Sequence, residues 1–181
     1  MKIGVLLEEF YDENNIPNGG IDKDTFELKL FGFSINVPNP EFRKRVTYIH
    51  DLHHLINKKD TSWKGEAYIS GWEIATGIGK HFPVCLLSIW AMGYSLWLFP
   101  REVFVGYKEG LKYHGPIGMN ISKAEYMQMN LQQLKAVLMR EKPAKMDLVH
   151  WIYFLFFVIL GQVLFALPAI ALITLLLINF I

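Results

Sequence analysis

The sequence predicts an all-α protein, in which a helical domain with a small N-terminal β-hairpin is followed by a C-terminal transmembrane helix. Three observations carry this prediction. Apolar residues recur at helical spacing over much of the chain, one short segment alternates apolar and polar residues, and residues 151–181 are almost wholly apolar. We therefore expect a helical domain at 1–147 and a membrane anchor at 148–181.

Composition narrows the class of protein. Of the 181 residues, 52% are hydrophobic and 19% are charged, whereas about 25% are charged in a typical soluble domain. This hydrophobicity excludes a disordered chain, and a single cysteine, Cys85, excludes a disulfide scaffold. The formal net charge of +1 gives no basis for nucleic-acid binding, so we expect no nucleic-acid partner.

The predicted hairpin lies near the N-terminus. Two short runs alternate apolar with polar residues on either side of Phe31-Gly32, which is typical of two strands joined by a tight turn. The apolar positions are Phe26, Leu28 and Leu30 in the first run, and Phe33, Ile35 and Val37 in the second.

Four helices are expected between the hairpin and the anchor. The first begins at Asn39-Pro40, with asparagine as N-cap and proline at the first helical position, and ends near Lys59. The second runs from about Ser62 to Gly79, and the others cover 84–99 and 122–140. The uncharged 84–99 segment is short for a membrane span, which favours a buried or membrane-grazing helix. The expected packing positions include Ile49, Ile56, Ile69, Trp72, Ile78, Leu134 and Leu138.

The C-terminal segment has no charged residue after Asp147. It is longer than the roughly 20 helical residues that cross a bilayer core. Pro168 interrupts the run, so a single kinked span and a re-entrant hairpin both remain open. Basic residues cluster just before the run, between Lys135 and Lys145, and the positive-inside rule places the domain in the cytoplasm. We expect a single-pass C-terminal anchor in a bacterial inner membrane.

A group of residues with metal-binding chemistry lies in the first predicted helix. His50 and His54 are one turn apart on the same face, and Asp51 is three residues before His54. If residues 58–61 form the bend of a helical hairpin, Glu66 and His54 lie at nearly the same height along the axes of the two helices. Two imidazoles and two carboxylates suit a divalent metal, zinc or non-haem iron. The sequence therefore predicts His50, Asp51, His54 and Glu66 as metal ligands.

Other interpretations of these residues stay open. Asp51 and Glu66 could instead pair with nearby basic residues as a solvated polar edge. His53 projects into the apolar stripe, which favours a core histidine. Glu73 lies two turns after Glu66 on the same helix face. We expect its side chain to pack in the core, or to contact a metal ligand without contacting the metal itself.

The spacing His50-Asp51-x-x-His54, then eleven residues, then Glu66, resembles the signature of the coenzyme Q (ubiquinone) biosynthesis protein 4 family. Phe42-Arg43-Lys44-Arg45-Val46 and Gly65-Glu66 are also similar to that family, and weaker similarity extends over roughly residues 35–140. Family members usually lack the C-terminal spanning segment.

The resemblance implies a membrane-associated all-α protein that binds long prenyl tails, with the four signature residues as metal ligands. It implies a lyase that takes part in ubiquinone biosynthesis, through metal-dependent C1 decarboxylation and oxidation of a prenylated hydroxybenzoate. The expected partners are this quinone precursor, the membrane and other quinone-biosynthesis enzymes, with a homo-oligomer as a further expectation. The alternative function is a non-catalytic lipid-binding scaffold that organises those enzymes.

Overall fold

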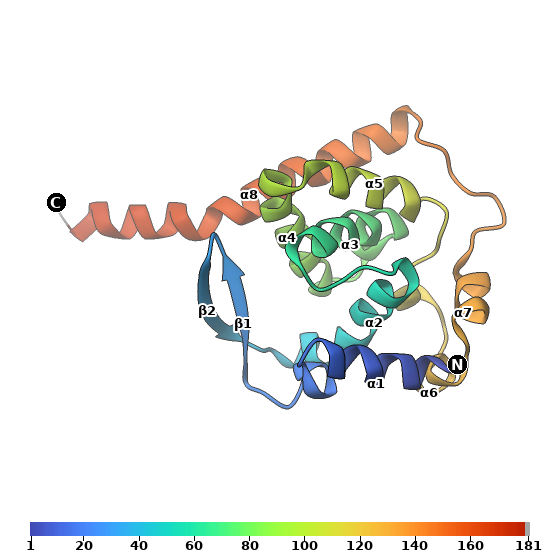
Figure 1. Cartoon of the computed structure of the whole chain (residues 1–181). Coiled ribbons are helices and arrows are strands. Elements are labelled where there is room, and N and C mark those ends of the chain that lie inside the picture. The colour runs from blue at the N-terminus through green and yellow to red at the C-terminus, as the bar shows by residue number, and fades with distance from the viewer. Residues whose placement is uncertain (180–181) are drawn as a thin grey trace. The chain divides into compact units, whose positions relative to one another are not determined.

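The computed structural model describes residues 1–179, apart from the side chains of residues 172, 173 and 179. The predicted anchor segment includes residues 180 and 181, which lie outside the described residues. The chain forms two compact units: unit 1 is Met1–Lys58 with Met119–Leu138, and unit 2 is Lys59–Gly118 with Met139–Ile181. Helices dominate both units, and a long apolar helix forms the C-terminal segment (Figure 1). The predicted fold class is confirmed.

The hairpin in unit 1 has the predicted strands and turn. β1 (Thr25–Leu30) pairs antiparallel with β2 (Phe33–Pro38), and Leu28 lies opposite Ile35. Phe31 and Gly32 form the turn with φ angles of 49° and 85°. A two-residue turn with positive φ at both positions matches the twist of antiparallel strands.

The first helices of unit 1 are α1 (Ile3–Glu13) and α2 (Glu41–Asn57). The sequence pattern predicts no specific range for α1. α2 begins one residue later than predicted, because Pro40 and not Asn39 occupies the N-cap position. The Asn39 side chain instead donates to the carbonyls of Gly20 and Lys23, at 3.0 and 2.9 Å, and so holds the preceding loop.

The predicted helix at 122–140 is divided in two. α6 (Lys123–Gln128) begins with a capping box between Ser122 and Glu125, and α7 (Leu131–Leu138) follows after a break at residues 129 and 130. Asn130 causes the second start, because its Oδ1 accepts from the N–H of Gln133 at 2.9 Å while Gln133 Oε1 accepts from the N–H of Asn130. Leu134 and Leu138 are fully buried, as predicted.

Unit 2 is built on α3 (Trp63–Thr76), α4 (Val84–Leu98) and α5 (Pro100–Gly110). Ser62 caps α3 by accepting a hydrogen bond from the N–H of Gly65. α3 ends before its predicted limit, since Gly77 adopts a left-handed conformation and a short 3₁₀ turn follows at Ile78–Lys80. Ile69, Trp72 and Ile78 are buried, as predicted.

The C-terminal helix, α8 (Leu148–Asn179), continues through Pro168 without a break. Among the described residues it is the one helix long and apolar enough to cross a membrane, over Leu148–Ile178. Within unit 2 its first half packs on the core, where Phe154 and Phe157 are buried, and its second half extends beyond the other helices of the unit (Figure 1). A continuous helix favours the single kinked span over the re-entrant hairpin.

Candidate metal centre

The histidines of α2 lie where the spacing predicts. His50 and His54 are one helical turn apart, and their Nε2 atoms are 3.2 Å from each other. The ring centroids are 4.9 Å apart with an interplanar angle of 73°. His54 is almost fully buried and His50 is half-buried, so the pair faces away from bulk water.

This separation fits two ligands of one metal ion. Zinc–nitrogen bonds of about 2.0–2.1 Å with a tetrahedral angle place two ligand nitrogens about 3.3 Å apart. The observed separation of the His50 and His54 Nε2 atoms, 3.2 Å, is close to that value. A direct hydrogen bond between the rings is also possible at this distance, provided that one ring carries its proton on Nε2. The pair therefore has the geometry of a metal-ligand pair without any rearrangement of α2.

Asp51 is buried and its carboxylate is held from α1. The hydroxyl of Tyr11 donates to Asp51 Oδ2 at 2.9 Å. Burial raises the pKa of the Tyr11 hydroxyl far above its ordinary value, and the charge of Asp51 and this hydrogen bond add to the shift. Tyr11 therefore stays protonated and remains a donor over the whole physiological range.

Gly19 leaves room for this hydrogen bond. It has a φ of +66°, and a Cβ atom added there would lie 2.9 Å from the Tyr11 hydroxyl oxygen and 3.3 Å from Asp51 Oδ2. The loop that contains Asn18-Gly19-Gly20 thus closes over the Tyr11–Asp51 pair within unit 1. The sequence does not reveal the relation of this loop to Asp51, because the partners are distant in the chain.

The glutamates with ligand chemistry are on α3 in unit 2. Glu66 lies in the first turn of the helix and is half-buried. Glu73, two turns on, is 2% exposed, and its Oε2 accepts a hydrogen bond of 2.5 Å from the Ser88 hydroxyl of α4. A buried carboxylate is costly unless it is hydrogen-bonded, and Ser88 meets part of that requirement.

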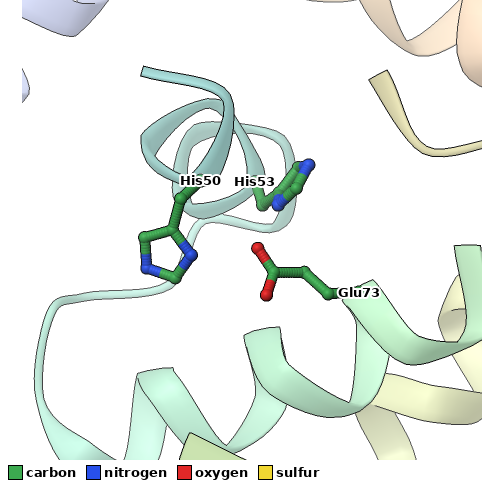
Figure 2. A group of neighbouring side chains, drawn as sticks. All are labelled: His50, His53 and Glu73. Carbon is green, nitrogen blue, oxygen red and sulfur yellow. The ribbon is translucent and has the colours of Figure 1, made fainter. Parts of the chain in front are cut away.

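Side chains that could ligate a metal ion are His50, His53 and His54 on α2 in unit 1, and Glu66 and Glu73 on α3 in unit 2. Figure 2 labels three of them: His50 and His53, which α2 carries, and Glu73, which α3 carries. Three of the four ligands that the sequence predicts, His50, His54 and Glu66, are among these side chains, and Asp51 is not. His53, expected in the core, is indeed buried. Regular helical spacings relate the additional candidates to the predicted ligands: His53 is three residues after His50, and Glu73 is seven after Glu66.

An open cavity of about 630 Å³ lies beside Tyr11 in unit 1. Lys44 and Lys123 line it together with the acidic residues Glu8 and Asp12. This mixture of charges does not select an anionic or a cationic ligand. The cavity therefore adds space next to the Tyr11–Asp51 pair without defining what enters it.

No family model, curated protein or solved structure matches this chain. The likeness to the coenzyme Q biosynthesis protein 4 family consequently depends on the sequence signature.

Proposed function

We propose that this protein is a metal-dependent enzyme of prenyl-quinone biosynthesis that acts on a prenylated hydroxybenzoate at a membrane. The observation that carries the proposal is the 3.2 Å separation of the His50 and His54 Nε2 atoms, which suits two ligands of one ion. The signature spacing to Glu66 and the long apolar helix α8 support it further.

In the proposed site, His50 and His54 bind the metal through Nε2, and Glu66 supplies a carboxylate oxygen. Asp51 is the fourth proposed ligand, and Tyr11 orients its carboxylate through a hydrogen bond to Oδ2. The proposed ligands are carried by α2 and α3. His53 and Glu73 are the competing ligand candidates on the same two helices.

The metal would supply Lewis-acid stabilisation of negative charge on a substrate oxygen. In the decarboxylation the bond between the ring carbon and its carboxyl group breaks, carbon dioxide leaves and a proton takes its place. Oxidation at the same carbon would require an electron acceptor from outside the chain, of the class of dioxygen. Zinc has no redox chemistry, so zinc suits decarboxylation alone and iron suits the coupled oxidation.

Metal content tests the proposed ligands directly. Protein purified in mild detergent should carry close to one equivalent of zinc or iron, measured by elemental mass spectrometry. His54→Ala and Glu66→Ala should each lose the metal while circular dichroism stays helical, and His114→Ala, at an exposed histidine with no assigned role, should keep it. If Glu73→Ala loses the metal and Glu66→Ala keeps it, the ligand set is His50, His53 and Glu73 instead. Full metal content in His54→Ala, Glu66→Ala and Glu73→Ala alike would reject the site.

Lipid mass spectrometry tests the reaction. A strain that lacks this gene should accumulate a prenylated hydroxybenzoate that still has its ring carboxyl group. The wild-type gene should restore the quinone pool, and Glu66→Ala should not. An unchanged quinone pool in the deletion strain would overturn the proposed function. Full restoration by a variant shown to lack metal would favour the non-catalytic scaffold.

A further inference from the structure

The first half of α8 is apolar on two opposite faces. Its inner face packs in the core of unit 2 through Phe154, Phe157 and Gly161. Its outer face is exposed, with apolar side chains at i, i+3, i+4, i+7 and i+11. These are Ile152, Leu155, Phe156, Ile159 and Val163, whose exposed fractions range from 50% to 64%. A helix that is hydrophobic all round needs an apolar cover on every side, and the protein core covers only one.

α4 lies beside this part of α8 and also has exposed apolar residues. It contains no charged side chain from Val84 to Leu98. Trp97 is 68% exposed and Leu98 is 44% exposed. Trp97 reaches α8 through a hydrogen bond from Nε1 to Gln162 Oε1 at 2.9 Å, and Trp90 contacts Phe165 with ring centroids 5.7 Å apart. The exposed surfaces of the two helices therefore adjoin.

The contact between α4 and α8 has the features of helix packing in lipid. A Cβ atom at Gly93 would lie 2.2 Å from the carbonyl oxygen of Gly161, so the two backbones touch at a pair of glycines. Gln162 uses both ends of its amide on α4, because Nε2 donates to the carbonyl of Gly93 while Oε1 accepts from Trp97. Small residues at the crossing and a polar side chain that is hydrogen-bonded across the two helices are typical of membrane helices.

The outer surface continues along the second half of α8. Its described side chains from Leu167 to Ile178 are exposed, and nearly all are apolar. Thr174, a polar residue in this stretch, donates its hydroxyl back to the carbonyl of Ile170 at 2.9 Å. A polar side chain in hydrocarbon is expected to be satisfied in this way.

We propose that the folded body of unit 2 is itself immersed in the bilayer. The outer faces of α4 and of the first half of α8 form one lipid-contacting surface, which we call the α4–α8 surface. Its occupant is the acyl-chain region of the membrane, because the surface runs without a break into the exposed second half of α8. The anchor is then not a flexible tether, since two packed helices hold the body of unit 2 in the lipid. This inference does not depend on the metal site or on the proposed reaction.

Cysteine accessibility tests the α4–α8 surface. Cys85 is the single cysteine and is buried, so Cys85→Ser gives a background without thiols. Single cysteines are then placed at Leu98 on α4, at Ile159 on the first half of α8, at Leu177 on its second half, and at Lys112 as an exposed control. Reaction with a charged maleimide is followed in membranes opened by freeze–thaw, and again after solubilisation in sodium dodecyl sulfate. Maleimides need a thiolate in water, so a cysteine in lipid reacts slowly.

We expect the cysteines at Leu98, Ile159 and Leu177 to react at least tenfold more slowly than the cysteine at Lys112 in membranes. All four should react alike in sodium dodecyl sulfate. Protection at Leu177 alone would show that only the second half of α8 enters the membrane, and would overturn the proposal. Efficient oxidative cross-linking of Ile159→Cys between chains would show a second copy on the surface and would also overturn it.

Tryptophan quenching distinguishes lipid from protein as the cover. Full-length protein is reconstituted into vesicles of phosphatidylcholine and phosphatidylglycerol, with or without bromine on the acyl chains. Brominated chains should quench the wild-type fluorescence more than that of Trp97→Phe. Equal quenching in the two proteins would place Trp97 outside the lipid and contradict the proposal, whatever the metal content or activity.

Discussion

The hydroxyl of Tyr11 donates to Asp51 Oδ2 at 2.9 Å, and this hydrogen bond joins α1 to the histidine-bearing helix α2. Asp51 lies directly after His50, so whatever fixes its carboxylate also fixes this turn of the helix. Tyr11 is 40 residues away in the chain. The proposed metal site thus depends on a contact that the signature itself does not include.

Replacing Tyr11 with phenylalanine should weaken metal binding. Tyr11→Phe keeps the ring but removes the donor that orients Asp51, and loss of such a supporting hydrogen bond typically lowers metal affinity about 10- to 100-fold. Competition with a chromophoric chelator would measure the change. Tyr48→Phe is the matched control, because it alters another tyrosine of unit 1 and keeps the ring that the Lys123 ammonium covers. Equal affinity for Tyr11→Phe and wild type would show that Tyr11 plays no part in the site.

Alanine substitutions at two adjacent glycines distinguish the effect of steric crowding at Asp51 from the effect of backbone strain. Gly19 and Gly20 both have positive φ, at +66° and +68°, but a Cβ atom meets Tyr11 and Asp51 only at Gly19 and meets nothing within 4 Å at Gly20. Gly20→Ala should therefore lower the free energy of unfolding by about 1–2 kcal/mol, the cost of a left-handed alanine. Gly19→Ala should cost roughly 1 kcal/mol more through overpacking.

Denaturant unfolding in mild detergent, followed by circular dichroism, would measure both losses. Metal affinity provides the second comparison, because only Gly19→Ala displaces the Tyr11–Asp51 pair. Identical behaviour of the two alanine variants in both measurements would mean that the loop does not constrain the pair.

Ser88 should matter more to stability than another buried serine of the same unit. The Ser88 hydroxyl donates to the buried carboxylate of Glu73, whereas the Ser70 hydroxyl donates to the carbonyl of Ala67 in its own helix. Hydrogen bonds to charged groups contribute about 1.5–3 kcal/mol, against about 1 kcal/mol for neutral ones. Ser88→Ala should accordingly lower the free energy of unfolding by about 2 kcal/mol, and Ser70→Ala by less than about 1 kcal/mol. A larger loss for Ser70→Ala would contradict this assignment.

Local signals in the sequence account for the parts of the fold that were predicted. The alternation around Phe31-Gly32 specifies the hairpin because side chains alternate faces in a strand, and Ser62 marks the start of α3 because its hydroxyl can accept a backbone N–H. The separation of His50 and His54 by four residues places both rings on one helix face. Each of these features depends on residues that are close together in the chain.

The features that were not predicted depend on distant partners or on competing local bonds. Nothing in the sequence around Tyr11 indicates that its hydroxyl contacts Asp51. Asn130 restarts the helix because its side chain and that of Gln133 each accept a hydrogen bond from the other's backbone N–H, although Met127 and Leu131 on either side keep helical spacing. The apolar run of α8 predicts a membrane helix but not that Phe154 and Phe157 pack into the core of unit 2. Hydropathy cannot distinguish lipid from a protein interior, because both are apolar.

The crossing of α3 and α5 requires glycine on both helices. A Cβ atom at Gly106 would lie 1.9 Å from the carbonyl oxygen of Tyr68, and one at Gly71 would lie 2.0 Å from the carbonyl oxygen of Val103. Backbone meets backbone at both points, so neither contact can be relieved by turning a side chain. The helices would have to separate to admit a methyl group, and the core residues Val103 and Tyr107 would lose their packing.

Gly106→Ala should therefore destabilise the protein, although replacing glycine by alanine inside a helix ordinarily stabilises it. In an ordinary helix interior, alanine is about 0.5–1 kcal/mol more stable than glycine. At Gly106 we expect a loss of more than about 3 kcal/mol, because overpacking against backbone outweighs that gain. Gly4→Ala in α1 is the control, since its Cβ atom would lie an ordinary 3.5 Å from Met127 and the substitution should be neutral or stabilising by up to about 1 kcal/mol. Thermal unfolding in mild detergent measures both, and a Gly106→Ala protein as stable as wild type would show that α3 and α5 do not cross this closely.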